Sequence, residues 1–315
     1  ETSGTIVLRH ELGHNFGRVG EEYDGGGYFG ANNSSSLSSL KWEHWIDSAE
    51  NLLAQPAKAL FLDWPWENLG DGPFVANFNS DGEYPYAKLR FSVSGIPEAD
   101  QVEIKVNDTP LPFTSRGTED RTFYDYELDA FTAGAHSITF TEQVSDGNNW
   151  VSSMTVHEFK EDYNFDRENI GAYPVFSRSG RVAGYRSNHE KCLMRNMKSP
   201  DFCSVCVENN WLQFFGKIDM IDGVSQDSSE AGTTVTLATQ ELGQLRASGL
   251  GRDGERLLVR WFRNGSEVEG LADQFQWTLP TRDAQGTWEV RVEFVTPEVR
   301  KDDRELLKDS ATFRI

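Results

Sequence analysis

The sequence is organised around one short stretch near its amino end, Arg9-His10-Glu11-Leu12-Gly13-His14-Asn15-Phe16-Gly17. On a helix, residues four apart lie on the same face, so His10 and His14 can reach one metal ion, while Glu11 lies about 100° round the axis. Two imidazoles and a carboxylate at this spacing are typical of a zinc site in which the carboxylate activates a water molecule. The stretch therefore predicts a helix that holds Zn²⁺ on His10 and His14, with Glu11 as the catalytic base.

The residues around this helix predict how it is held and where it ends. A buried apolar stripe is expected from Ile6, Val7, Leu8, Leu12 and Phe16. Gly17 predicts the end of the helix and a turn, which is required because a third ligand has to fold back on the histidines. On an unbroken helix Glu21 would lie roughly 10 Å along the axis from His14. After a turn either Glu21 or Glu22 can reach the metal, and we favour Glu21.

Residues 10–24, HELGHNFGRVGEEYD, resemble the zinc helix and the acidic turn of the IgA-peptidase family of zinc metallopeptidases. Residues 185–206 resemble the segment around that family's Met-turn, and residues 169–173 resemble a further family stretch. The resemblance covers residues 1–75 and 165–215 and implies a metzincin-like zinc endopeptidase with an acidic third ligand and with Met194 beneath the metal. Two features depart from the family pattern: Glu21 stands where Asp is expected, and no Pro follows Ser187.

Composition and charge limit the classes of partner. The chain has 315 residues, 37% of them hydrophobic, and a net charge of -20. This length allows two or three domains, and no apolar run approaches the ~20 residues that span a membrane. Because the acidic charge repels phosphates, neither nucleic acid nor an anionic membrane surface is an expected partner. We expect a protein or peptide substrate, with other extracellular or surface proteins as candidate partners.

The three cysteines, Cys192, Cys203 and Cys206, lie close together in the sequence and allow at most one internal disulfide. A bridge from Cys192 to Cys203 or Cys206 is expected. A redox CxxC would need a strand before it and a helix after it, and a structural zinc site would need a fourth ligand nearby. Neither interpretation of Cys203 and Cys206 is therefore adopted at this stage.

Four asparagines occur in the acceptor pattern for N-glycosylation, namely Asn32, Asn33, Asn107 and Asn264. Together with the family resemblance, they favour a secreted or cell-surface protein. Nine residues precede His10, whereas the resembled family places a substrate-binding sheet ahead of its zinc helix. We therefore expect the chain to be the C-terminal part of a longer polypeptide, with a catalytic part incomplete at its N-terminus.

From Ala87 the hydrophobic pattern alternates with period two, which predicts strands at 88–93, 101–106, 122–128 and 136–140. Further alternating segments after Lys217 predict an Ig-like sandwich that buries Trp261. The expected fold class is an α+β metzincin-like catalytic part with two β-sandwiches. Its domains are the zinc helix and following segments at 1–84, an inserted β-sandwich at 85–160, the Met-turn and closing helix at 161–216, and the Ig-like sandwich at 217–315.

The leading hypothesis for function is a secreted zinc endopeptidase in which Glu11 activates water. Such an enzyme needs a donor for the oxyanion beside the metal, and Tyr185 is the expected one. The alternative hypothesis is a cell-surface or extracellular structural or adhesion protein whose peptidase fold is inactive or incomplete. The sequence does not identify a substrate, because specificity depends on the residues of a site rather than on a fold.

Overall fold

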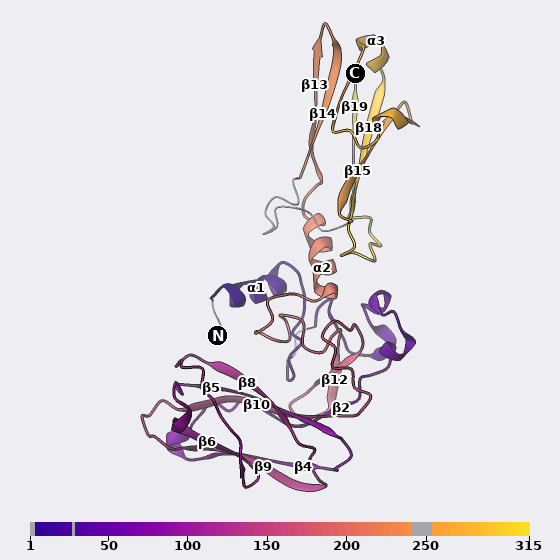
Figure 1. The fold of residues 1–315 in the computed structure, drawn as a ribbon. Coiled ribbons are helices and arrows are strands. Elements are labelled where there is room, and N and C mark those ends of the chain that lie inside the picture. The colour runs from indigo at the N-terminus through magenta and orange to yellow at the C-terminus, as the bar shows by residue number, and fades with distance from the viewer. Residues whose placement is uncertain (1–3, 27–28, 241–253) are drawn as a thin grey trace. The chain divides into compact units, whose positions relative to one another are not determined.

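The computed structural model describes residues 4–26, 29–240 and 254–315 and divides into two compact units, Glu1–Cys206 and Val207–Ile315. The described residues form five sheets, and the strands within each sheet pair antiparallel (Figure 1). Their α-helices are short: α1 (Gly4–Asn15), α2 (Ser204–Phe215) and α3 (Thr281–Ala284). The predicted α+β metzincin-like class is therefore wrong. Strands such as β4 (Phe74–Ser80) and β18 (Thr287–Val295) alternate buried and more exposed residues with period two, which is typical of antiparallel sheets with one buried face.

About half of the first unit is a β-sandwich. One sheet has the order β2-β10-β5-β8, with β3 paired to β10, and the other has the order β4-β9-β6-β7. Figure 1 shows the two sheets as two layers. The strands are β2 (Ala57–Asp63), β3 (Glu67–Asn68), β4 (Phe74–Ser80), β5 (Tyr86–Ser94), β6 (Val102–Val106), β7 (Thr109–Pro110), β8 (Thr122–Leu128), β9 (Gly134–Glu142) and β10 (Trp150–Phe159). The sandwich thus starts at Ala57, earlier than the predicted residue 85.

Strict alternation along the strands explains the core of this sandwich. In β4, Phe74, Ala76 and Phe78 are buried and the residues between them are exposed. In β5, Leu89 and Phe91 are fully buried, and their side chains meet those of the facing sheet. Each such side chain contributes about 1.5–3 kcal/mol by leaving water. The sandwich therefore provides a rigid support for the residues that surround it.

The rest of the first unit connects α1 to the sandwich. A small sheet of order β1-β12-β11 combines β1 (Asn33–Ser34), β11 (Tyr173–Phe176) and β12 (Val182–Arg186). Short 3₁₀ turns occur at η1 (Leu37–Ser39), η2 (Glu43–Trp45), η3 (Ala49–Leu52), η4 (Leu69–Asp71) and η5 (Ala99–Gln101). A separate apolar cluster includes Val19, Trp42, Trp45, Met194 and the three cysteines. This cluster joins segments that lie far apart in the sequence.

Helix α1 does not bury the apolar stripe that the sequence predicted. Val7, Leu8 and Leu12 are 36%, 68% and 55% exposed, whereas His10 and Gly13 are buried. A Cβ on Gly13 would lie 2.9 Å from the ring of Phe202 and 3.1 Å from Met194 Sδ. The helix therefore packs through its histidine and glycine face, because the missing side chain at Gly13 permits a close approach.

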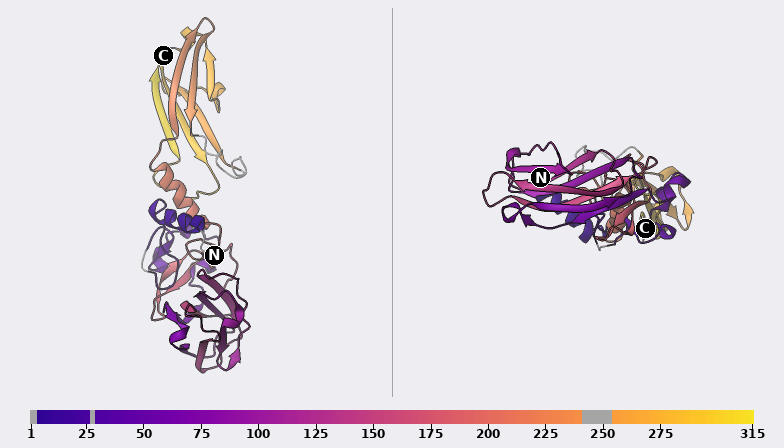
Figure 2. Two further views of the ribbon diagram at one scale, coloured as in Figure 1. Left: turned by 90° about the vertical axis from the view of Figure 1, so that its left-hand side faces the viewer. Right: turned by 90° about the horizontal axis from the view of Figure 1, so that it is seen from below.

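The second unit is another β-sandwich with its own core. Its sheets have the orders β13-β14-β17 and β16-β15-β18-β19, and Figure 2 shows its long strands running side by side. The elements are β13 (Ile221–Ser229), β14 (Gly232–Thr239), β15 (Arg256–Arg263), β16 (Ser266–Glu267), η6 (Glu269–Leu271), β17 (Gln276–Leu279), β18 (Thr287–Val295) and β19 (Lys308–Arg314). Trp261 is fully buried and packs in one cluster with Trp277 and Trp288.

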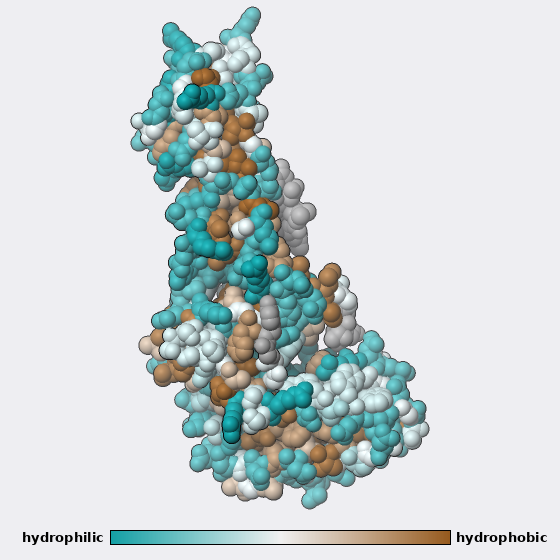
Figure 3. All heavy atoms as spheres, turned by 180° about the vertical axis from the view of Figure 1, so that it is seen from behind, coloured by the Kyte–Doolittle hydropathy of each residue, from teal (hydrophilic) through white to brown (hydrophobic). Residues whose placement is uncertain are grey.

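The face drawn in Figure 3 is mainly hydrophilic, with small separate hydrophobic patches. Among the residues described, no helix is both long enough and apolar enough to cross a membrane.

Candidate metal site

Helix α1 and the turn that follows it bring three predicted ligands together. His14 Nε2 lies 3.1 Å from His10 Nε2 and 3.0 Å from Glu21 Oε1, and His10 Nε2 lies 3.3 Å from the same carboxylate oxygen. The chain reverses where Arg18 adopts a positive φ of 51° and Val19 N donates to Gly13 O. The turn that the sequence required near Gly17 is therefore present, and it returns Glu21 to the histidines.

The other ring nitrogens of both histidines face backbone carbonyls. His10 Nδ1 lies 3.3 Å from Leu193 O, and His14 Nδ1 lies 2.8 Å from Val19 O. A carbonyl can only accept, so each Nδ1 carries the proton and each Nε2 presents a lone pair to the shared centre. Backbone carbonyls commonly orient metal-binding histidines in this way. Tyr23 also stacks on His10, with 5.7 Å between ring centroids, and fixes the ring plane.

These three residues fit a zinc ion. Three acceptor atoms converge, and the second carboxylate oxygen, Glu21 Oε2, is buried without a hydrogen-bond partner. Two imidazole nitrogens and one carboxylate, with a further position open, form a donor set typical of catalytic zinc. Burial lowers the pKa of His10, but the hydrogen bond and negative charge of Glu21 outweigh burial and leave that pKa above its ordinary value. A proton and a cation therefore compete for this centre.

Glu22, the other candidate for third ligand, points to a different place. Its side chain is fully buried, and its Oε1 accepts from Asn32 Nδ2 at 2.7 Å. Burial raises the pKa of Glu22 to about 8. Because neighbouring residues on an extended turn project in opposite directions, only Glu21 reaches the histidines.

The candidate metal site lies beside a pocket of about 380 Å³, which His10 and Glu21 line. The pocket is bounded by α1, by residues 21–24, which we call the acidic turn, by the outer face of the β2-β10-β5-β8 sheet and by the segment after Met194. Glu11 lines it beside His10 and Glu21, as do Trp64 and Phe123. The predicted base and two of the three candidate ligands, His10 and Glu21, therefore line one cavity.

Arg121 also lines this pocket, and no sequence pattern indicated it. Its Nε donates to Ser92 Oγ and Ser152 Oγ, both at 3.1 Å, and its guanidinium lies over the ring of Phe123 at 4.7 Å. Burial lowers the pKa of Arg121. Within the described residues, no carboxylate forms an ion pair with Arg121. A cation without an acidic partner is suited to an anionic group of a ligand.

The other basic side chains of the pocket are neutralised by a network of buried ion pairs. Arg195 lies 2.9 Å from Asp24 and 3.2 Å from Glu190, and Arg90 lies 2.6 Å from both Glu190 and Asp125. The network joins the acidic turn, the sandwich and the segment after Met194. These ion pairs therefore fix the walls of the pocket relative to one another. Arg121 differs from Arg90 and Arg195 because no carboxylate among the described residues pairs with it.

Met194, the predicted Met-turn residue, and Tyr185, the predicted oxyanion donor, lie in different places relative to the histidines. Met194 is fully buried with its sulfur beside Gly13, and its carbonyl accepts from Glu22 N at 3.1 Å. Tyr185 lies in β12, where it pairs with Pro174 and Ser34, and it does not line the pocket. The geometry thus brings Met194 close to the site and keeps Tyr185 away from it.

The predicted disulfide and glycosylation residues also have definite positions. The three cysteines are free, so the predicted disulfide is not present: Cys192 Sγ lies 3.5 Å from Cys206 Sγ, whereas a disulfide is about 2.05 Å long.

Of the predicted glycosylation residues, Asn32 and Asn33 are buried, and their amides bind the backbone of Gly20 and Glu21. They are thus structural residues of the acidic turn. Asn107 and Asn264 are exposed at turns, with φ of 53° and 50°.

Comparison with known proteins identifies no family: no family model and no curated protein matches the sequence. Some solved structures show a weak likeness. A ruminal GH26 endo-β-1,4-mannanase is 18% identical, with a TM-score of 0.22 over 36% of this chain and 21% of its own. A family 35 carbohydrate-binding module from an environmental isolate is 16% identical, with a TM-score of 0.22 over 31% and 82%. The CBM36-1 domain of a xylanase from the Trinervitermes trinervoides hindgut metagenome is 8% identical, with a TM-score of 0.23 over 32% and 95%.

These findings correct the sequence-based recognition. The described residues fold mainly into antiparallel sheets rather than an α+β metzincin-like domain, and the solved structures named above are, by name, carbohydrate-active enzymes and carbohydrate-binding modules. The assignment to the IgA-peptidase family and the endopeptidase function derived from it are therefore wrong, and so is the description of the chain as a metalloprotease. The physical reason is that a short metal-binding motif specifies local chemistry, whereas the fold is set by the strands of the whole chain. The chain spans about a fifth of the length of the mannanase.

Proposed function

We propose that this chain is an extracellular binding protein in which a Zn²⁺ ion, held by His10, His14 and Glu21, forms one end of a pocket for an anionic ligand. The observation that carries the proposal is the convergence of His10 Nε2, His14 Nε2 and Glu21 Oε1 at 3.0–3.3 Å. Three acceptors at such distances repel one another unless a positive charge lies between them. A cation supplies that charge.

Arg121 supports the anionic character of the ligand. Arg121 lines the same pocket as His10 and Glu21, and the planar fork of donors on its guanidinium matches the geometry of a carboxylate. Trp64 and Phe123 line the same pocket and provide apolar surface. A ligand with a carboxylate at Arg121 and a donor atom toward the metal site satisfies both ends.

Metal analysis of the purified chain tests the metal site. We expect zinc to bind stoichiometrically at the histidine site, His10→Ala to remove that zinc and Glu21→Gln to weaken its binding. His136→Ala is the matched control, because His136 lies in the sandwich, where its ring contacts Thr132 O. Equal zinc content in the parent and in both site variants would refute the proposal.

Calorimetric titration with small carboxylates tests the ligand class. The panel comprises succinate, uronic acids and short peptides with free carboxyl ends. For a member that binds the zinc-loaded protein, we expect Arg121→Ala to weaken binding about 10–100-fold and Arg121→Lys to restore part of it. Binding that is insensitive to both variants would contradict the role of Arg121.

A second candidate function is zinc-dependent hydrolysis, and the position of Glu11 favours it. Glu11 lines the pocket beside two metal ligands, where it can accept a proton and return it to a leaving group. Zinc bound there would supply a polarised water at neutral pH. The test is a panel of chromogenic glycosides and esters with the Glu11→Gln variant, which should keep its zinc. Turnover at the parent rate in that variant would eliminate Glu11 as the base.

The extracellular location rests on two observations. Asn107 and Asn264 carry acceptor patterns and are exposed at turns. Expression through a eukaryotic secretory pathway should give a mass shift, removable by an N-glycosidase, that Asn107→Gln together with Asn264→Gln abolishes. Asn32→Gln and Asn33→Gln should not affect that shift, because both side chains are buried.

A further inference from the structure

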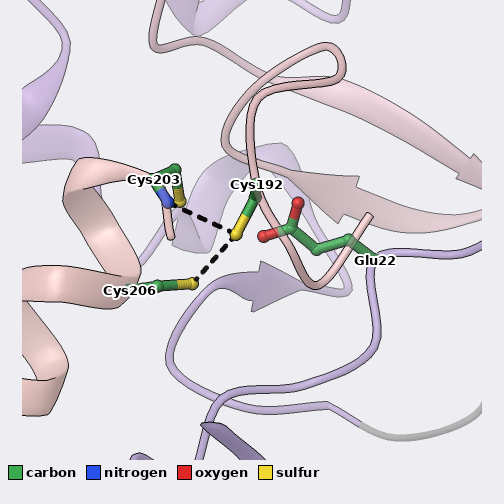
Figure 4. A group of neighbouring side chains, drawn as sticks. All are labelled: Glu22, Cys192, Cys203 and Cys206. Atoms are coloured by element: carbon green, nitrogen blue, oxygen red, sulfur yellow. Dashed lines mark hydrogen bonds between the residues drawn. The ribbon is translucent and has the colours of Figure 1, made fainter. Parts of the chain in front are cut away.

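A second group of metal-binding side chains lies inside the first unit, away from the pocket. Glu22, Cys192, Cys203 and Cys206 are each fully buried, and one donor atom of each lies within 4.8 Å of all the others. Figure 4 shows the three sulfurs and the carboxylate turned toward a common centre. The residues come from the acidic turn, the loop after β12 and the start of α2.

The spacing of the sulfurs fits a tetrahedral ion. Zinc–sulfur bonds of about 2.3 Å place two thiolate ligands roughly 3.8 Å apart at a tetrahedral angle. The distance from Cys192 Sγ to Cys206 Sγ is 3.5 Å. Cys203 and Cys206 also have the C-x₂-C spacing of structural zinc sites. The fourth ligand that such a site needs is Glu22, which is distant in sequence and adjacent in space.

The burial of Glu22 calls for a positive charge. A buried carboxylate is costly unless it is paired or coordinates a metal. Among the described residues, Glu22 forms no ion pair; its side-chain partners are the amides of Asn32 at 2.7 Å and Asn188 at 3.5 Å. Arg186 and Arg195 lie near enough for their charges to act on Glu22 but form no ion pair with it among the described residues, and three thiols lie beside its carboxylate. A cation at their centre would compensate the carboxylate.

Further groups surround the cluster in the manner of a metal site. Cys203 N lies 3.4 Å from Cys192 Sγ, and Ser187 Oγ lies 3.4 Å from Cys203 Sγ. Hydrogen bonds of this kind stabilise thiolates, and an amide on the carboxylate ligand orients it. The cluster is therefore more polar than the usual apolar site of a buried cysteine.

We propose that Glu22, Cys192, Cys203 and Cys206 bind one structural Zn²⁺ ion with tetrahedral geometry. Its role is to tie the acidic turn to α2 and to the loop after β12, which fixes the position of Glu21 next to Glu22. The site does not depend on the function proposed for the pocket, because the two donor sets share no residue.

Zinc X-ray absorption on the full chain tests this site without reference to the pocket. The double variant His10→Ala/His14→Ala should retain one zinc per chain, with sulfur scattering at about 2.3 Å. Cys203→Ser should lose that zinc, whereas Ser204→Ala, the adjacent matched control, should keep it. A double-histidine variant without zinc, or with only nitrogen and oxygen around it, would overturn the proposal.

Thiol counting on the parent protein gives a result that does not require a variant to fold. With zinc present we expect slow alkylation of the native protein. After chelation and denaturation without a reductant, all three cysteines should react. Alkylation of a single cysteine under those conditions would reveal a disulfide and refute the site.

Discussion

At the scale of residues, the two adjacent glutamates of the acidic turn contact different groups of side chains. Glu21 lies 3.0 Å from His14, and Glu22 lies within the cysteine cluster. We expect Glu21→Gln to lower the zinc affinity of the histidine site at least about 10-fold, because an amide is a weaker ligand than a carboxylate. Competition with a chelator measures this loss, and Glu22→Gln is the matched comparison, which should instead remove the sulfur-bound zinc. Loss of the same zinc in both variants would contradict the separation of the two sites.

At the scale of elements, α1 gives a prediction about packing. Gly13→Ala gains about 1 kcal/mol of helix propensity, but its Cβ would lie 2.9 Å from Phe202 and 3.1 Å from Met194. Overpacking costs about 1–3 kcal/mol, so the strain outweighs the gain and the free energy of unfolding should fall.

The exposed residues of the same helix provide the control for this prediction. Leu8 and Leu12 are 68% and 55% exposed, so Leu8→Gln and Leu12→Gln should change the free energy of unfolding by no more than about 0.5 kcal/mol. Urea denaturation of the three variants measures the difference. An equal loss in all of them would mean that α1 packs through its apolar side.

At the scale of the whole molecule, His189 predicts how stability depends on pH. Burial lowers the pKa of His189 to about 3 from 6.5, and Tyr163 contacts its Nδ1 at 2.7 Å. Between these values the unfolded chain binds the proton and the folded chain does not, so stability is present above pH 6.5 and is lost as the pH falls. From pH 6.5 to pH 5 the loss due to this residue is about 2 kcal/mol.

Urea denaturation at pH 7 and pH 5, with a chelator present, measures this loss. His189→Phe should reduce the difference between the two pH values by about 2 kcal/mol, even though it removes the partner of Tyr163 at both. His157, whose pKa is also lowered by burial, contributes in the same direction in both proteins. An unchanged difference in the variant would show that His189 is not the group that titrates.

The sequence by itself determined the features that depend on local spacing. The four-residue separation of His10 and His14 placed both rings on one side of a helix, and period-two alternation indicated strands such as β5 and β8. It also required a turn near Gly17. Each of these follows from backbone geometry within a few residues, so no distant contact was needed to predict them.

Only the tertiary structure decided which residues meet. It directed Glu21 and Glu22 to different groups of residues and buried Asn32 and Asn33, although both carry the acceptor pattern for glycosylation. It also brought Arg121 of the sandwich to the pocket lined by His10 and Glu21. It also supplied the fourth member of the cysteine cluster, whose absence from the local sequence argued against a zinc site there. The motif suggested a metzincin-like fold, but the antiparallel sheets and the comparisons overturned that assignment. The physical reason is that burial, charge pairing and ligand sets depend on residues distant in sequence, which no local pattern specifies.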